Sequence, residues 1–118
     1  MSAAIEIGRV YDPPRPEDGR RILVDRLWPR GLSKDAAELD EWCKQVAPSA
    51  ELRGWYGHDP QRFEEFAARY RAELEDPQRA EAVREIAEAA RQGRVTLLTA
   101  TKELSLSHAA ILAEAIGD

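Results

Sequence analysis

Two short apolar runs constrain the fold of this chain more than any other feature. Residues 22–24 read Ile-Leu-Val and residues 95–98 read Val-Thr-Leu-Leu, with no charged side chain in either run. Uninterrupted runs of this kind are typical of strands covered on both faces, as in a parallel sheet packed by helices. We therefore expect strands over residues 21–27 and 94–99. Residues 5–11 predict another strand, because Ile5 and Ile7 alternate with Glu6.

Capping residues predict where the helices begin. A serine or aspartate that can accept a hydrogen bond from the first turn precedes each predicted helix. These predicted caps are Ser33, Ser49, Asp59, Asp76 and Ser107. A proline directly follows both aspartates, as is common at the first helical position. Residues 38–46 fit two patterns: three apolar residues lie at helical spacing, but Trp42 and Lys44 alternate as on an edge strand, and we favour the strand.

The predicted order is two strands, a short third strand, several helices, a buried strand and a last helix. This order predicts an α/β fold, a single compact Rossmann-like domain with a mainly parallel or mixed sheet flanked by helices. The length of 118 residues suits one domain spanning residues 1–118.

Composition narrows the classes of function. The single cysteine, Cys43, excludes an intramolecular disulfide and any metal site built on several cysteines, so we expect no metal. A chain with one cysteine, no signal peptide and no apolar run of membrane-spanning length is expected in the cytoplasm. No Gly-rich dinucleotide or phosphate loop occurs, so the motifs imply no cofactor.

The charge of the chain is unevenly distributed. The net charge is −5, which argues against nucleic acid as a partner. Basic residues nevertheless gather between Arg20 and Lys34. A local basic patch on an acidic protein suits a small anionic ligand better than a long phosphate backbone.

One segment carries an unusual string, Asp-Arg-Leu-Trp-Pro-Arg-Gly-Leu at residues 25–32. Together with Arg-Val-Tyr-Asp at 9–12, Ala-Pro-Ser at 47–49 and His-Asp-Pro at 58–60, it resembles the YeaO-like family (domain of unknown function 488) along nearly the whole chain. The resemblance implies an α/β fold and carries no assigned reaction. Relatives tend to have acidic and amide side chains where this chain has Leu-Ser-Leu-Ser at 104–107, which implies an altered site.

Ligands of open α/β sheets bind beyond the carboxyl ends of the strands. We therefore expect the polar residues that follow each predicted strand to meet at one edge. The predicted ligand-binding residues are Tyr11, Arg26, Arg30, Lys34, Thr101, Lys102 and Ser107, and the catalytic candidates are Asp25, His58 and His108. A phosphate or carboxylate group held by Arg26 and Arg30, near the start of the last helix, is the resulting hypothesis.

Two other interpretations stay open at this point. Asp25 and Arg26 can simply pair with other charges, and Arg30 can stack on Trp28.

The leading function is a small-molecule binding domain or an enzyme, a hydrolase or transferase rather than an oxidoreductase. The alternative is a non-catalytic protein-interaction or regulatory module, able to form a homodimer through exposed tryptophans.

Overall fold

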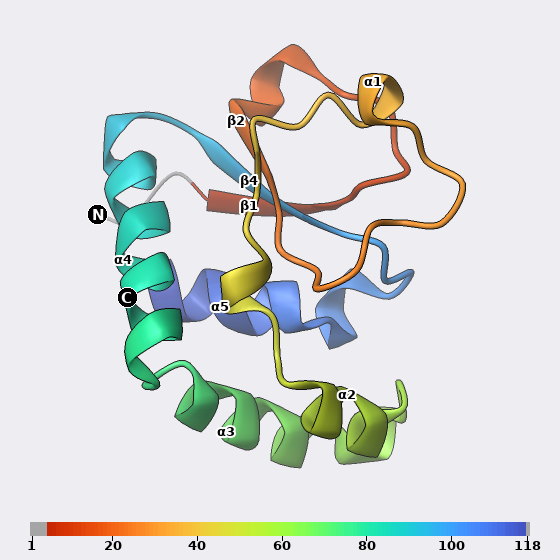
Figure 1. The fold of residues 1–118 in the computed structure, drawn as a ribbon, viewed down its shortest axis with the longest axis vertical. Helices are drawn as coiled ribbons and strands as arrows, with labels where there is room; N and C mark the ends of the chain where they lie inside the picture. Colours follow the sequence, from red (N-terminus) through yellow and green to blue (C-terminus); the bar gives the residue numbers. More distant parts are fainter. Residues whose placement is uncertain (1–4, 118) are drawn as a thin grey trace.

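A computed structural model describes residues 5–117 and contains a four-stranded sheet with the order β1-β4-β2-β3 (Figure 1). The strands are β1 (Ile5–Arg9), β2 (Arg20–Leu23), β3 (Glu41–Trp42) and β4 (Val95–Thr99). Every pairing between them is parallel. The predicted parallel sheet is therefore confirmed, and the short third strand lies at one edge.

Strand β2 ends earlier than the sequence predicts. The backbone N–H of Val24 still donates to Leu98 O at 3.0 Å, but the next residue leaves the sheet. There the side chain of Asp25 accepts a hydrogen bond from the backbone of Ala100 at 2.8 Å, so it joins the loops that follow β2 and β4. The predicted extension to residue 27 is wrong because the chain turns here to form a loop.

Five α-helices accompany the sheet: α1 (Lys34–Ala37), α2 (Ala50–Tyr56), α3 (Phe63–Glu73), α4 (Pro77–Gln92) and α5 (His108–Gly117). The described residues also form four short 3-10 turns: η1 (Pro16–Asp18), η2 (Lys44–Val46), η3 (Pro60–Arg62) and η4 (Leu104–Leu106). All helices predicted from the sequence are present among the described residues.

Most of the predicted caps are confirmed. Ser33 Oγ accepts from Ala36 N and Ser49 Oγ accepts from Leu52 N, each at 3.1 Å. Asp76 occupies the predicted N-cap position of α4, with a proline next to it, but its side chain accepts no capping bond within residues 5–117. Its carboxylate lies 3.8 Å from the guanidinium of Arg79.

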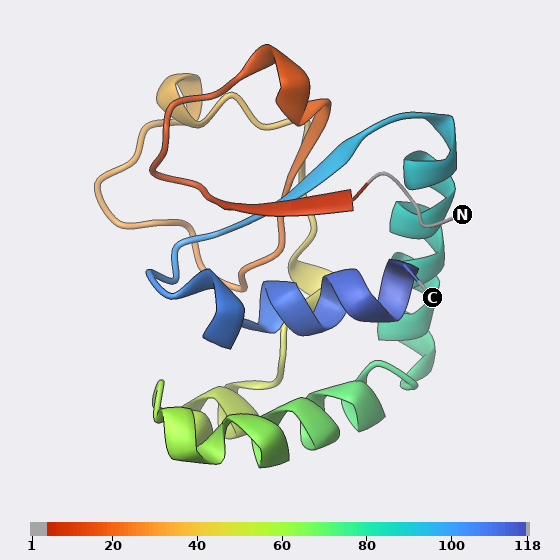
Figure 2. The same ribbon diagram turned by 180° about the vertical axis from the view of Figure 1, so that it is seen from behind.

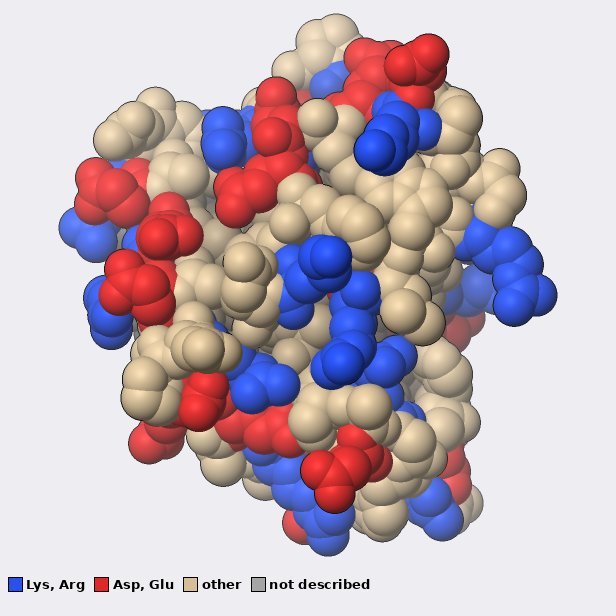
Figure 3. Space-filling model, viewed as in Figure 1, with Lys and Arg blue, Asp and Glu red and all other residues tan. Residues whose placement is uncertain are grey.

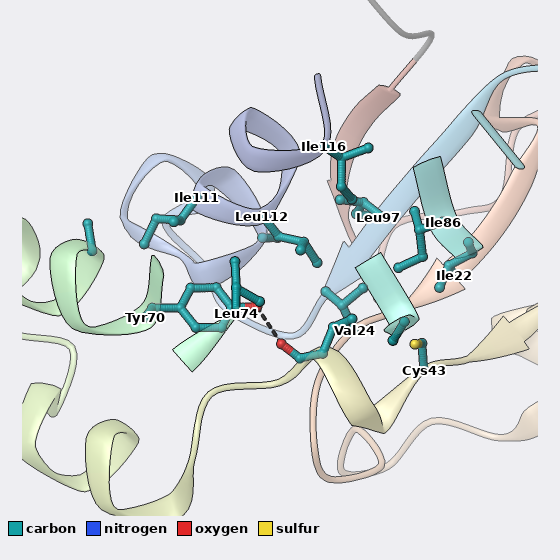
Figure 4. Packing of buried hydrophobic residues seen from close by; sticks show 14 of the residues in the cluster. Ile22, Val24, Cys43, Tyr70, Leu74, Ile86, Leu97, Ile111, Leu112 and Ile116 are labelled. Carbon is teal, nitrogen blue, oxygen red and sulfur yellow. Dashed lines mark hydrogen bonds between the residues drawn. The ribbon is translucent and has the colours of Figure 1, made fainter. Parts of the chain in front are cut away.

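The two faces of the sheet are covered differently. Helix α5 lies against one face, α4 and α3 pack on α5, and α2 packs on α3 (Figures 1 and 2). This side holds the main core, in which Ile22 and Leu97 from the sheet join Ile86, Tyr70 and Leu112 from the helices (Figure 4). The opposite face holds a smaller cluster around Val10, Leu23 and Leu98. Trp42 of β3 packs on it together with Trp28, Leu32 and Leu39 from the connection between β2 and β3.

The hydroxyl of Tyr70 makes the most buried side-chain hydrogen bond of the main core. Tyr70 has no exposed surface, and its hydroxyl donates to the backbone oxygen of Val46 (Figure 4). Replacing Tyr70 with phenylalanine leaves that oxygen without its donor, so we expect a loss of about 1–3 kcal/mol in the free energy of unfolding, measured in urea. Tyr11→Phe is the control: its hydroxyl bonds to Arg30 O at the surface, and its loss should be below about 0.5 kcal/mol. Equal losses would contradict the argument.

Candidate functional site

A cavity of about 660 Å³ lies beyond the carboxyl ends of β1, β2 and β4. Tyr11, two residues after β1, forms one part of its wall. The other parts are the loop after β2, helix α2, the loop after β4 and the start of α5. The lining residues include Tyr11, Asp25, Arg26, Trp28, Arg30, Arg53, Tyr56, His58, Thr101, Leu106, Ser107 and His108. Parallel strands bring these segments together because their carboxyl ends share one edge.

The structure places most of the predicted site residues around this cavity. Tyr11, Asp25, Arg26, Arg30, His58, Thr101, Ser107 and His108 all line it. Lys102 lies in an adjoining hollow of about 430 Å³, which shares His58 and Thr101 with the cavity. That these residues meet follows from the geometry; that they bind a ligand stays a prediction.

Lys34 lies elsewhere and does not line the cavity. Helix α1, which begins with Lys34, ends beside the start of β2, where the guanidinium of Arg21 donates to the backbone oxygens of Ala37 and Glu38 at 2.8 and 3.1 Å. This is the amino edge of the sheet, opposite to the cavity. The connection from β2 must return there because β3 runs parallel to β2.

The arginines of the cavity differ from those of the rest of the chain. Within residues 5–117, every arginine takes part in an ion pair except Arg9, Arg26, Arg30 and Arg53. The last three of these four line the cavity. The Nε of Arg53 is also buried with no acceptor among the described residues. Figure 3, which has the same viewpoint as Figure 1, shows Lys and Arg side chains gathered near the middle of the face turned toward the reader.

The local contacts of Arg30 and Trp28 differ from the stacking interpretation. The hydroxyl of Tyr11 donates to Arg30 O at 2.8 Å, which ties the loop after β2 to the residues after β1. Trp28 packs edge-on against Trp42, with ring centroids 5.3 Å apart, and its Nε1 donates to Leu32 O. The cation–π contacts among residues 5–117 involve Tyr11, Trp42 and Trp55 and do not include Arg30 on Trp28, so the predicted stacking is wrong. Arg30 lines the cavity instead.

Asp25 and His108 meet at the wall of the cavity. Asp25 Oδ2 accepts from the backbone N–H of Ala100 at 2.8 Å. Asp25 Oδ1 is buried, lies 3.4 Å from His108 Nε2 and has no hydrogen-bond partner among residues 5–117. His108 Nε2 lies closer, at 3.0 Å, to the backbone oxygen of Val24. That contact requires Nε2 to carry the proton and to act as the donor.

Burial of the imidazole lowers the pKa of His108, although the neighbouring Asp25 carboxylate and the bond to Val24 O act in the opposite direction. A neutral imidazole with its Nε2 proton directed at a backbone oxygen serves mainly to join the start of α5 to the end of β2. Burial likewise raises the pKa of the Cys43 thiol to about 11, so it is not a thiolate at neutral pH.

Two features are absent from residues 5–117, the part of the chain that the structure describes. No group of three His, Cys, Asp or Glu side chains in it is arranged to hold a metal ion. No helix in it is long and apolar enough to cross a membrane.

Helix α2 contributes a wall that sequence reasoning missed. Ala50, Arg53 and Gly54 line the cavity and lie three and four residues apart, which places them on one face of the helix. The helix itself was predictable from the Ser49 cap. Its contact with the carboxyl edge was not, because the hydroxyl of Tyr56 fixes it by donating to Leu106 O, fifty residues along the chain.

Fold and site together define a small α/β domain whose parallel sheet presents an arginine-lined cavity at its carboxyl edge. The chain belongs to the YeaO-like DUF488 family: the family described as "Inactive DUF488-N3 subclade" matches residues 4–118. This confirms the resemblance found in the sequence.

Relatives from two bacteria match over 110 residues each. "Uncharacterized protein Rv3073c" of Mycobacterium tuberculosis (strain ATCC 25618 / H37Rv) is 48% identical, covering 93% of this chain and 91% of its own. "Uncharacterized protein YeaO" of Escherichia coli (strain K12) is 42% identical, covering 93% and 94%. No solved structure matches the chain, so the Rossmann-like part of the fold prediction stays a prediction.

Proposed function

We propose that this chain is a non-catalytic binding domain for a small anionic ligand, held in the cavity at the carboxyl edge of the sheet. The observation that carries the proposal is the state of the cavity arginines: Arg26, Arg30 and Arg53 lack ion-pair partners within residues 5–117, whereas the arginines outside the cavity, apart from Arg9, are paired. Guanidinium groups bind phosphate and carboxylate through charge-assisted, often bidentate, hydrogen bonds.

Three observations favour binding over catalysis. The family description contains the word "Inactive". The Nε2 of His108, the best candidate base, is occupied by Val24 O. The stretch at 104–107 contributes Leu106 and Ser107 to the cavity wall, and the Ser107 hydroxyl donates to Leu104 O at 2.6 Å. A leucine at this position supplies no acid, base or nucleophile.

The electrostatics favour a small ligand over a nucleic acid. The net charge of −5 repels a long polyanion, while a cluster of arginines in a concave site raises the electrostatic potential locally.

All three tryptophans, which the alternative interaction module would use as anchors, are half-buried. Trp55 lies beneath the guanidinium groups of Arg62 and Arg69, at 5.3 and 4.3 Å from the ring centroid. The cavity arginines therefore support the binding domain more directly than the tryptophans support an interaction module.

The experiment is a thermal-shift screen followed by calorimetric titration. Inorganic phosphate, ribose 5-phosphate and citrate serve as probes for the chemical class. A ligand at 100 times its dissociation constant stabilises the folded state by about 2.7 kcal/mol, which is several degrees for a domain of this size. Replacing both Arg26 and Arg30 with alanine should weaken binding on the order of 100-fold, since each charge-assisted bond contributes roughly 1.5–3 kcal/mol.

The matched control removes the same charge from α4, away from the cavity. Arg84 and Arg91 are exposed and pair only with Glu81 and Glu88 on their own helix. The double variant R84A/R91A should bind the probes as the parent does. If no probe stabilises the parent, or if the cavity and control variants bind equally, the proposed function is wrong, and the interaction module becomes the better interpretation.

A further inference from the structure

We propose that the ligand of the cavity is a phosphomonoester that also carries a hydroxyl group, and that Asp25 Oδ1 accepts a hydrogen bond from that hydroxyl. This inference rests on the proposed function and names the class of molecule that the site takes.

Asp25 is held so that one oxygen is used and the other is free. Oδ2 accepts from Ala100 N, and the backbone oxygen of Asp25 accepts from Trp42 Nε1, both at 2.8 Å. One bond holds the side chain of Asp25 and the other holds its backbone. Oδ1 is shielded from solvent and has no donor among residues 5–117. A buried oxygen without a donor costs about 1–3 kcal/mol, more when it is charged, so a donor supplied by the ligand would recover that energy.

The side chain of His108 lies close enough to Asp25 Oδ1 to be considered as this donor. Its Nε2 carries a single hydrogen, and the nitrogen lies 3.0 Å from Val24 O and 3.4 Å from Asp25 Oδ1. The shorter contact takes the hydrogen. Oδ1 is therefore an acceptor without a donor, on a residue that lines the cavity.

The charges of the wall distinguish a phosphate with a hydroxyl from the alternatives. Arg26, Arg30 and Arg53 contribute +3 and Asp25 contributes −1, so these four cavity residues sum to +2. A phosphomonoester carries about −1.5 to −2 at pH 7 and neutralises this sum. A carboxylate would leave about one positive charge, and an ammonium donor on the ligand would add another. A neutral hydroxyl gives Asp25 its donor without disturbing the balance.

The cavity volume of about 660 Å³ lies within the usual range for small-molecule sites, ~300–1,000 Å³. A sugar phosphate and a nucleoside monophosphate both present the required pair of groups. Titrations with ribose 5-phosphate and with adenosine 5′-monophosphate separate these sources. Tighter binding of either than of inorganic phosphate supports the inference, and the tighter of the two identifies the source.

The decisive experiment compares two ligands of equal length by calorimetric titration of the full chain. Glycerol 3-phosphate carries hydroxyl groups and propyl phosphate carries none. We expect the parent to bind glycerol 3-phosphate at least about tenfold more tightly. In Asp25→Asn, which keeps an oxygen for Ala100 N, the preference should disappear, while propyl phosphate binds as well as or better than it does to the parent because a negative charge is gone.

The outcomes separate the two proposals. If the parent binds both phosphates with equal affinity, the hydroxyl inference is overturned and the anion site stands. If it binds neither phosphate but binds citrate, the phosphomonoester inference is overturned while the anion site stands; if it binds none of these anions, the proposed function fails and the inference fails with it. The comparison of ligands on the parent needs no variant, so it decides the question even if Asp25→Asn does not fold. Where that variant does fold, checked by circular dichroism, retention of the hydroxyl preference also overturns the role of Asp25.

Discussion

Replacing Arg21 with methionine is expected to lower the free energy of unfolding by about 3–5 kcal/mol. The Arg21 side chain is 7% exposed, and its guanidinium is fully engaged: Nη1 lies 2.5 Å from Asp18 Oδ2, while Nε and Nη2 donate to Glu38 O and Ala37 O. Methionine matches the length of the stem but leaves a buried carboxylate and two backbone oxygens without these donors. Urea denaturation at neutral pH measures the loss.

Arg20→Met is the matched control, one residue away on the same strand. Arg20 is exposed and pairs with Glu41 at 3.2 Å across the surface, an interaction that contributes at most about 1 kcal/mol. If the two variants lose the same stability, the Arg21 network is no stronger than a surface ion pair, and the argument is wrong.

The pH dependence of the Arg21→Met deficit gives an independent check. Burial by itself raises the pKa of Asp18, but hydrogen bonds from the Arg15 backbone and from the Arg21 and Arg15 side chains outweigh it, and the pKa is lowered. A carboxyl group with a lowered pKa stabilises the fold fully above its unfolded pKa of about 3.9 and loses that contribution as the pH falls through its folded value. The deficit should therefore be full at neutral pH and shrink in acid, below about pH 4.

The two edges of the sheet use the same residue type in opposite ways. At the amino edge, Arg21 has its donors satisfied by the chain itself. At the carboxyl edge, Arg26 and Arg30 extend from the loop that follows the same strand, with no ion-pair partner in residues 5–117. Removing Arg21 should therefore affect stability, whereas removing Arg26 and Arg30 should affect ligand binding with little change in stability. This contrast makes the binding test interpretable.

The elements of the fold were predictable because their signals are local. The apolar runs at 22–24 and 95–98 and the Ser49 cap depend only on neighbouring residues, and all three predictions are confirmed. The placement of Lys34 was not local. Lys34 follows Arg30 by four residues in sequence, but the chain between them crosses from the carboxyl edge toward the amino edge so that β3 can run parallel to β2.

The contacts of Arg21 and Arg53 were unpredictable for the same physical reason. An arginine beside an apolar run normally faces solvent. Arg21 is buried because the turn at the end of α1 presents two backbone oxygens to it, and Arg53 reaches the cavity because α2 is tied to Leu106. Both contacts depend on segments brought together by the sheet, which no pattern within either segment records.

Replacing Gly19 with alanine is expected to cost about 2–5 kcal/mol, from two sources that add. Gly19 has a φ of 66°, a conformation that side chains other than hydrogen rarely adopt, which contributes roughly 1–2 kcal/mol. A Cβ at this position would also lie 2.2 Å from Arg94 O, the backbone oxygen that accepts from Arg20 N where β2 begins to pair with β4. The backbone must move to relieve this overlap, at a further cost of about 1–3 kcal/mol.

Gly31→Ala separates the two sources. Gly31 has a similar φ of 78°, but a Cβ there would meet no atom within 4 Å. It should therefore lose only the roughly 1–2 kcal/mol that belongs to the backbone conformation. The excess loss in Gly19→Ala measures the close approach of residue 19 to Arg94, and with it how firmly the start of β2 is held against β4. If both variants lose the same free energy of unfolding in urea, the backbone at residue 19 moves away from Arg94 O at no cost. The register of β2 against β4 would then depend on the Arg21 network instead.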